Sequence, residues 1–255
     1  MKHLLLCDNA DLDSVVELAA KNNLGIEFQT FYDPAVFDRV DEVAERYRKL
    51  VAELPFCGMH GPFADLYPGG MDPLVREVAR KRFEQAVEIA GKLNVSHIVL
   101  HHGYIPGTSF PKNWIERNRD FWREFLEGKP EELRIHLENL FETDPNFMAE
   151  MVAAIDDPRV DLCLDVGHIN CHAGGKALEW IRVLAGKIGY VHLHNNDGKN
   201  DEHTGLTNGT LPMYEVCAAL NEHTPNAIWA LEDRVDETMP QSIDWLRENG
   251  FLPSS

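Results

Sequence analysis

Short apolar runs and longer amphipathic stretches alternate along the whole chain. Each apolar run holds four or five residues, which is the length of a buried strand rather than of a helix. The pattern occurs eight times. It predicts strands at Leu4–Cys7, Gly25–Phe28, Cys57–His60, Ile98–His101, Arg134–Glu138, Asp161–Asp165, Tyr190–His194 and Ile228–Glu232.

The stretches between these runs place apolar residues at the three- and four-residue spacing of a helix that buries one face. Asp33-Pro34, Asp72-Pro73 and Asp144-Pro145 each combine a capping side chain with the residue that suits a first helical turn. We expect helices at Asp11–Lys21, Phe37–Glu53, Val75–Leu93, Trp114–Leu126, Phe147–Ile155, Ala177–Leu184, Met213–Asn221 and Ser242–Asn249.

Eight strand–helix units in 255 residues predict a closed (β/α)₈ barrel of parallel strands, folded as a single domain over residues 1–255. The alternative is an open, doubly wound sheet. Nucleotide-binding sheets of that kind carry a Gly-x-Gly-x-x-Gly turn after the first strand, and the segment after Leu4–Cys7 has no such turn. The sequence therefore favours the barrel.

The composition is acidic, with 42 Asp and Glu against 24 Lys and Arg and a formal net charge of -18. Nucleic-acid binding depends on Lys and Arg at phosphates, so this balance disfavours nucleic acid and anionic membranes as partners. Five scattered cysteines without a Cys-x-x-Cys pair indicate reduced thiols. No apolar run approaches the about 18 residues of a membrane helix. We expect a soluble, cytoplasmic protein.

Imidazole and carboxylate side chains gather at the ends of six consecutive predicted strands, from the third to the eighth. In a barrel these carboxyl ends surround one cavity, where active sites lie. Burying so many titratable groups together is costly unless they pair with one another or bind metal. The polar residues are His60, His101, His102, Glu138, Asn139, Asp165, His168, His192, His194, Asp201, His203 and Glu232.

Each of these residues also has a structural interpretation. A strand-end histidine is often a hydrogen-bonded structural residue, Asp165 could cap the next helix, and Asp201 could belong to a turn. We assign Asp197-Gly198 to a turn. Alternate strand residues share a face, so periodicity does not choose between His192 and His194. Convergence on one barrel mouth favours a metal site, and imidazole with carboxylate but no thiolate suits Zn, Mn, Fe or Co.

Seven short motifs, together and in this order, resemble the xylose-isomerase-like TIM-barrel superfamily. They are HGPF, HHG, LEN, LDVGH, HLHNNDG, DEH and LED. The superfamily includes sugar epimerases, sugar-phosphate isomerases and endonuclease IV-type AP endonucleases, and the resemblance extends from Gly25-Ile-Glu27-Phe to the last strand. In epimerases of this type one divalent ion is held by four residues. The resemblance places these ligands at Glu138, Asp165, His194 and Glu232, with His168 touching the substrate.

Endonuclease IV-type members hold up to three zinc ions. The resemblance places their further ligands at His60, His101, Asp201 and His203, which with His168 gives nine candidates in all. His194 is preferred to His192 because the family ligand is followed three residues later by an acidic residue, here Asp197. Gly103 completes the family's His-x-Gly pattern, which favours His101 over His102. The expected cofactor is therefore divalent Zn or Mn, as one to three ions.

Two enzymatic hypotheses and one non-catalytic hypothesis follow. The first is a sugar or sugar-phosphate isomerase or epimerase, in which Glu138 and Glu232 transfer a substrate proton and His168 orients a substrate oxygen. The second is metal-dependent phosphoester hydrolysis of the AP endonuclease type. The third is a barrel that has lost activity and only binds a partner.

The first hypothesis implies a small-molecule carbohydrate substrate. We expect the substrate to contact His102, Asn139 and Arg234 beside the metal ligands. Phe63, Tyr67, Tyr104, Trp114 and Asn170 are candidates for the rim of its pocket, although each could serve in packing instead. Relatives of this kind are often dimers or tetramers, so the resemblance also implies a homo-oligomer.

Overall fold

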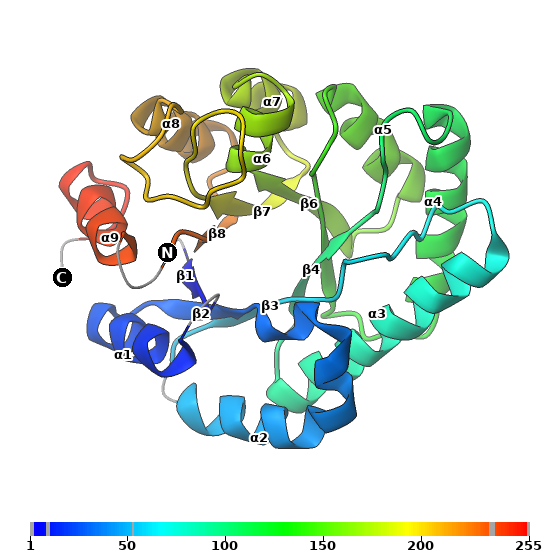
Figure 1. Cartoon of the computed structure of the whole chain (residues 1–255), viewed down its shortest axis with the longest axis horizontal. Coiled ribbons are helices and arrows are strands. Elements are labelled where there is room, and N and C mark those ends of the chain that lie inside the picture. The colour runs from blue at the N-terminus through cyan, green and yellow to red at the C-terminus, as the bar shows by residue number, and fades with distance from the viewer. Residues whose placement is uncertain (1–2, 9–10, 53, 235–237, 254–255) are drawn as a thin grey trace.

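Eight parallel strands close into a barrel in which their order around the ring follows their order in the chain. The computed structural model, which describes residues 3–8, 11–52, 54–234 and 238–253, therefore confirms the predicted (β/α)₈ architecture. Figure 1 shows the strands at the centre of a ring of helices. The strands are β1 (Leu4–Cys7), β2 (Gly25–Phe28), β3 (Cys57–His60), β4 (His97–His101), β5 (Arg134–Glu138), β6 (Val160–Asp165), β7 (Ile188–Leu193) and β8 (Ile228–Leu231).

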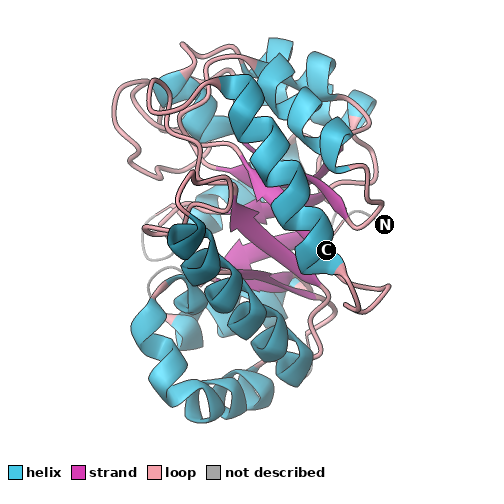
Figure 2. Ribbon diagram, turned by 90° about the vertical axis from the view of Figure 1, so that its right-hand side faces the viewer, coloured by secondary structure: helices cyan, strands magenta, loops and turns pink. Residues whose placement is uncertain are grey.

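The helices lie outside the strands, as the side view of Figure 2 shows. Among the described helices, none is long and apolar enough to cross a lipid bilayer. Two 3₁₀ turns, η1 (Thr30–Tyr32) and η2 (Pro34–Arg39), precede the second α-helix. The α-helices are α1 (Leu12–Asn22), α2 (Val40–Leu50), α3 (Pro73–Leu93), α4 (Pro111–Leu126), α5 (Pro145–Ile155), α6 (Val166–His172), α7 (Ala177–Leu184), α8 (Met213–His223) and α9 (Met239–Glu248).

The observed strand bounds agree with the predicted ones to within two residues, and the main differences lie in the helices. The helix predicted at Phe37–Glu53 begins only at Val40, because the 3₁₀ turn η2 occupies the preceding residues; Glu53 lies outside the described residues. Asp72 and Asp144 cap their helices as expected, each accepting a hydrogen bond from a backbone N–H two residues later.

Helix α6 was not predicted. It has seven residues and follows β6 directly, so it is too short to show helical periodicity in the sequence. Asp165 explains its start, because Asp165 Oδ1 accepts a hydrogen bond of 2.7 Å from the backbone N–H of His168. The capping alternative for Asp165 is therefore correct, and this role coexists with its place at the barrel mouth.

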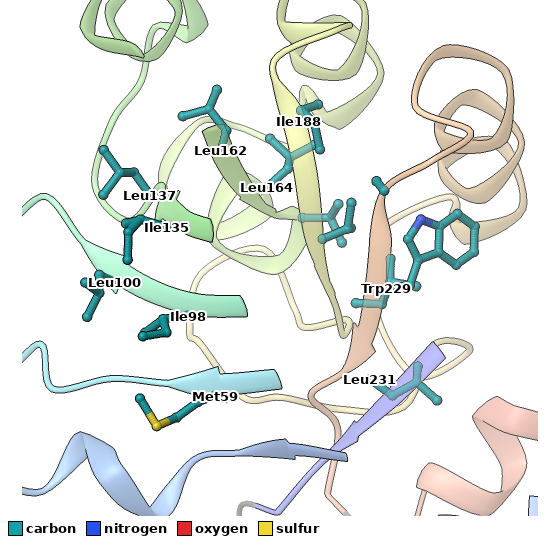
Figure 3. Close-up of a cluster of buried hydrophobic side chains, with 14 of the residues drawn as sticks. Met59, Ile98, Leu100, Ile135, Leu137, Leu162, Leu164, Ile188, Trp229 and Leu231 are labelled. Atoms are coloured by element: carbon teal, nitrogen blue, oxygen red, sulfur yellow. The ribbon is translucent and has the colours of Figure 1, made fainter. Parts of the chain in front are cut away.

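Strand residues alternate between the outside and the inside of the barrel. The outward side chains pack against the helices in one large hydrophobic core. Figure 3 shows part of it, with Met59, Ile98, Leu100, Ile135, Leu137, Leu162, Leu164, Ile188, Trp229 and Leu231. The inward side chains form a smaller apolar cluster of Leu5, Cys7, Val99, Cys163, Tyr190, Ile228 and Ala230. This inner plug separates the two ends of the barrel.

Below the plug, at the amino ends of the strands, lies a chain of three polar residues that we call the floor triad. The triad consists of His97 on β4, His136 on β5 and Asp161 on β6; His136 and Asp161 are paired in strand register, whereas His97 is paired with Arg134. His97 Nδ1 lies 2.9 Å from His136 Nε2, and His136 Nδ1 donates to the Asp161 carboxylate. The two imidazole rings stack with their centroids 5.2 Å apart. Hydrogen bonds thus join His97 to His136 and His136 to Asp161.

Candidate metal centre

Four buried side chains from neighbouring strands meet at the carboxyl end of the barrel. We call them the central group: Glu138 on β5, Asp165 on β6, His192 on β7 and Glu232 just after β8. His192 Nδ1 lies 3.1 Å from Glu138 Oε1, 3.2 Å from Glu232 Oε2 and 3.7 Å from Asp165 Oδ2. One imidazole nitrogen therefore faces oxygen atoms from three carboxylates.

A first flanking group lies beside the central group, on β3 to β5. His60 Nε2 and His101 Nε2 lie 3.1 Å and 3.0 Å from the same oxygen, Glu138 Oε2. Glu138 therefore belongs to both groups, with one oxygen turned toward each. All three members of the first flanking group are buried.

A second flanking group lies on the β6 and β7 side and combines His168, His194, Asp201 and His203. Asp201 Oδ2 lies 3.3 Å from His168 Nε2 and 3.1 Å from His203 Nε2. The rings of His194 and His203 stack at 4.1 Å between centroids. The group is less enclosed than the other two, because Asp201 and His203 come from the long segment after β7 and are partly exposed.

The segment after β7 is held in place by backbone and asparagine hydrogen bonds. Asn195 forms an antiparallel bridge with Thr204, and its side-chain amide donates to the carbonyl oxygens of Leu206 and Leu211. The Asp197 carboxylate accepts from the backbone N–H groups of the two residues that follow Gly198, as expected for a turn. These contacts return the chain to the mouth, so that Asp201 and His203 can face β6.

In three histidines, a hydrogen bond from Nδ1 to a backbone carbonyl determines that Nε2 is the nitrogen available to bind a metal. His60 Nδ1 donates to Gly61 O at 2.8 Å, His168 Nδ1 to Asn139 O at 2.8 Å, and His203 Nδ1 to Glu232 O at 3.0 Å. In each case Nε2 is left as the lone-pair nitrogen and faces the carboxylates of a group. Metal-binding histidines are commonly oriented by such bonds through their other nitrogen.

The electrostatics of the mouth favour a bound cation. Burial alone would lower the pKa of His192 and of His168, but nearby anionic groups raise both pKa values well above the usual range. For His203, burial is likewise outweighed by Asp201 and Glu232, which raise its pKa to about 9. The same negative potential that attracts protons to these rings would attract a divalent ion.

One orphaned atom tests whether the central group fits a divalent cation. Glu232 Oε2 is buried and has no hydrogen-bond partner among the described residues, which is costly for a carboxylate oxygen. It points toward His192 Nδ1 and the other carboxylates of the group. Three carboxylates and one imidazole form a donor set that Zn or Mn accepts. The residues of the central group therefore fit such an ion.

The structure brings all nine predicted ligands into the three groups, but it differs from the expectation for β7. His192 rather than His194 joins Glu138, Asp165 and Glu232. In strand register His192 lies level with Asp165, whereas His194 lies beyond the end of β7. His194 Nε2 lies 3.1 Å from Asp165 Oδ1. The His194 ring packs over Gly167, where an added Cβ would overlap it.

The three residues expected to contact the substrate have different surroundings. His102 is buried, lies 3.1 Å from Glu142 Oε1 and lines a pocket. The side-chain amide of Asn139 is occupied by both backbone groups of Asp165, at 3.0 Å and 2.9 Å, so it joins β5 to β6. Arg234 is exposed. Of the three, the structure places only His102 in the wall of the pocket.

The pocket of about 160 Å³ opens beside the first flanking group, with His101 and Glu138 in its wall. Phe63, Tyr67 and Tyr104 line it, as the sequence suggested, and Phe141 and Glu142 complete its far side. Trp114 and Asn170 are instead buried away from it. Sequence reasoning missed Glu142, because nothing in the segment after Asn139 distinguishes a pocket carboxylate from a solvated loop charge.

Two known structures resemble this chain over nearly its whole length. A structure described as a D-tagatose 3-epimerase-like protein is 25% identical, with a TM-score of 0.75, and the match covers 98% of this chain and 97% of that one. The structure of an IOLI protein with a bound zinc atom is 19% identical, with a TM-score of 0.76 and coverage of 98% and 96%. The second likeness is one of fold.

Comparison of the sequence with known proteins identifies the family. An uncharacterized protein of Methanocaldococcus jannaschii, MJ1311, is 27% identical over 257 residues, covering 93% of this chain and 84% of the relative. The model of the family described as xylose isomerase-like TIM barrel matches residues 15–249. The chain therefore belongs to the xylose isomerase-like TIM barrel family.

Proposed function

We propose that this protein is a divalent-metal-dependent isomerase or epimerase of a small carbohydrate, working by proton transfer at carbon. The observation that carries the proposal is the central group, in which three buried carboxylates converge on one imidazole nitrogen. The likeness to a D-tagatose 3-epimerase-like protein supports the same chemistry. The nine predicted ligands and His192 are proposed to hold one to three ions of Zn or Mn.

A divalent ion in the central group would polarise a carbonyl oxygen and acidify the neighbouring C–H bond of a bound sugar. Glu138 and Glu232 approach the group from β5 and β8, and we assign them the removal and return of the proton. Glu232 Oε2 lies 3.2 Å from His192 Nδ1 and accepts no hydrogen bond among the described residues, whereas Glu138 Oε2 lies within 3.1 Å of both His60 and His101. We also assign to His168, whose Nδ1 donates to the Asn139 carbonyl, the role of holding a substrate oxygen.

The pocket supports a small substrate. Its volume of about 160 Å³ is below the roughly 300–1,000 Å³ of typical drug-sized sites, which suits a monosaccharide better than a polymer. Aromatic side chains offer flat apolar surfaces to the C–H faces of a sugar ring, and the His102–Glu142 pair offers polar atoms to its hydroxyl groups. Among the described residues, no Lys or Arg lines this pocket.

Proton exchange tests the proposal directly. Wild-type protein loaded with Zn or Mn should exchange a carbon-bound hydrogen of at least one free ketose or aldose with D₂O, followed by NMR. We expect Glu138→Gln and Glu232→Gln each to reduce exchange by roughly 10²–10⁴-fold. Asp161→Asn is the matched control, since it removes a carboxylate that pairs with a histidine in the floor triad, outside the metal groups and the pocket. Metal-loaded wild type that exchanges no sugar hydrogen would overturn the proposal.

The flanking groups favour a second candidate, phosphoester hydrolysis by several adjacent ions. Glu138 links the first flanking group to the central group, as a bridging ligand does in a multinuclear site. Three zinc ions per chain together with nicking of abasic duplex DNA would establish this alternative. A single ion with sugar hydrogen exchange would exclude it in favour of the isomerase.

A further inference from the structure

A buried carboxylate lies directly beneath the central group and belongs to none of the candidate metal groups. Glu27 points inward from β2 and is fully buried. Its contacts are with polar neighbours: Oε2 accepts from His192 Nε2 at 3.1 Å, while Oε1 accepts from Gln29 Nε2 at 3.1 Å and from the Cys7 thiol at 3.4 Å. These donors compensate the buried charge, which a carboxylate in a protein interior requires.

The contact with His192 determines which nitrogen of that ring carries the hydrogen. Glu27 can only accept, so in the neutral ring, the form that binds metal, the hydrogen resides on Nε2 and the lone pair on Nδ1. Nδ1 is the atom that faces Glu138, Glu232 and Asp165. The opposite tautomer would place a hydrogen among those carboxylates, where a cation needs a lone pair.

The contact with Gln29 orients a second member of the central group. Gln29 Nε2 also donates to Glu232 Oε1 at 2.6 Å, which fixes the carboxylate and leaves its other oxygen, Oε2, turned toward the group. The backbone N–H of Gln29 donates in turn to Asp8, whose other oxygen accepts from Tyr47. Asp8 thus holds the backbone of Gln29, while the side-chain amide of Gln29 bridges Glu27 and Glu232.

We propose that Glu27 is a positioning residue for metal binding, which orients His192 directly and Glu232 through Gln29. This inference rests on the proposed metal site in the central group. Its role is distinct from ligation, because Glu27 reaches the group only through the far nitrogen of His192 and through the Gln29 amide.

Metal affinity of the Glu27→Gln variant tests the inference without any substrate. Metal-free protein is titrated with Zn against a chromophoric chelator. We expect a roughly 10–100-fold loss of affinity at the tightest site, because glutamine can offer its NH₂ group to His192 Nε2 and so move the ring hydrogen to Nδ1. Asp161→Asn is the matched control, since it alters a carboxylate–histidine pair of the floor triad and should leave the affinity unchanged.

Two further measurements separate positioning from folding. The ring ¹⁵N shifts of His192, recorded in the metal-free proteins at a pH high enough for the ring to be neutral, should show hydrogen on Nε2 in the wild type and on Nδ1 in Glu27→Gln. Gln29→Met, at a half-buried position, removes the hydrogen bonds to Glu232 and to Glu27 Oε1 but keeps the Glu27–His192 contact, so it should cause a smaller loss of Zn affinity with an unchanged tautomer. It also serves as the test if Glu27→Gln does not fold.

The outcomes distinguish this inference from the function on which it rests. Wild-type affinity for Zn in both Glu27→Gln and Gln29→Met, with Zn bound tightly by the wild type, would overturn the positioning role and leave the proposed isomerase intact. A wild-type protein without affinity for Zn or Mn would overturn both.

Discussion

The two ends of the barrel use the same residue types for different purposes. At the floor, His97, His136 and Asp161 form a linear chain in which each link pairs one nitrogen with one partner. At the mouth, imidazole and carboxylate atoms converge, so that one nitrogen of His192 faces three carboxylates. The three floor residues form hydrogen bonds with one another, whereas Glu232 Oε2 at the mouth has no hydrogen-bond partner among the described residues.

The pKa values of the histidines express this difference. Burial, together with the charges of His136 and Arg134, lowers the pKa of His97 to about 3. Burial acts in the same direction on His168, but Asp165 and Asp201 outweigh it and raise its pKa well above the usual range. Burial lowers the pKa of both histidines, so the difference between their pKa values comes from the charged groups beside them, which for His168 are carboxylates.

The largest expected effect of any single change at the mouth is at Glu138, which contributes to both the central and the first flanking groups. Glu138→Ala should abolish stoichiometric metal binding at these groups and reduce sugar hydrogen exchange by at least roughly 10²-fold. Elemental analysis of the purified variant measures the first effect and NMR the second. A variant that retains its full metal content would show that the convergence at the mouth is not a metal site.

The corresponding change at the floor should affect stability alone. His136→Phe removes the centre of the floor triad and leaves His97 and Asp161 without their partner. We expect a loss of about 1–3 kcal/mol in the free energy of unfolding, measured by urea denaturation of metal-free protein. Metal stoichiometry should not change. A loss of bound metal in this variant would contradict the separation of the two ends.

The pH dependence of stability should have opposite signs for His97 at the floor and for Asp8 near the mouth. The folded pKa of His97, about 3, lies below the unfolded value of 6.5, so the unfolded chain binds more protons between these values. Its contribution is fully present above pH 6.5 and is lost as the pH falls toward 3. His97→Gln should flatten that slope in urea denaturation of metal-free protein; an unchanged slope would refute the assignment.

Asp8, beside β1 at the mouth, should show a smaller effect of opposite sign. Burial raises its folded pKa to about 7, against the hydrogen bonds from Tyr47 and Gln29. The folded state therefore binds more protons between pH 3.8 and 7, so the contribution is present below pH 3.8 and lost as the pH rises through 7. Asp8→Asn should be more stable relative to wild type at pH 8 than at pH 5; the reverse order would contradict this.

The sequence predicted the barrel well because strand length and apolar periodicity are local properties. It also predicted that polar side chains from several strand ends meet, since parallel strands in a barrel share one carboxyl edge. The sequence could not decide between His192 and His194, because alternate residues share one face of a strand and these two differ in their position along the barrel axis. Depth depends on strand stagger, which no local pattern encodes.

Glu27 was missed for a related reason. As the third residue of a four-residue strand near the start of the chain it resembled part of a family motif and nothing more. Its significance arises from contacts with His192 and Gln29, and the first of these joins residues 165 positions apart. Asn139 shows the converse case, because a polar residue at a strand end turned out to join two strands.

Gly167 has a consequence for anyone who wishes to redesign this barrel. A methyl group at this position would occupy the space of the His194 ring, so even alanine would disturb the second flanking group. Gly91 on α3, by contrast, has open space around it. Residue 167 is therefore best held constant in a mutagenesis library, and diversity belongs at exposed pocket positions such as Ala64 and Phe141, where new side chains would face the pocket.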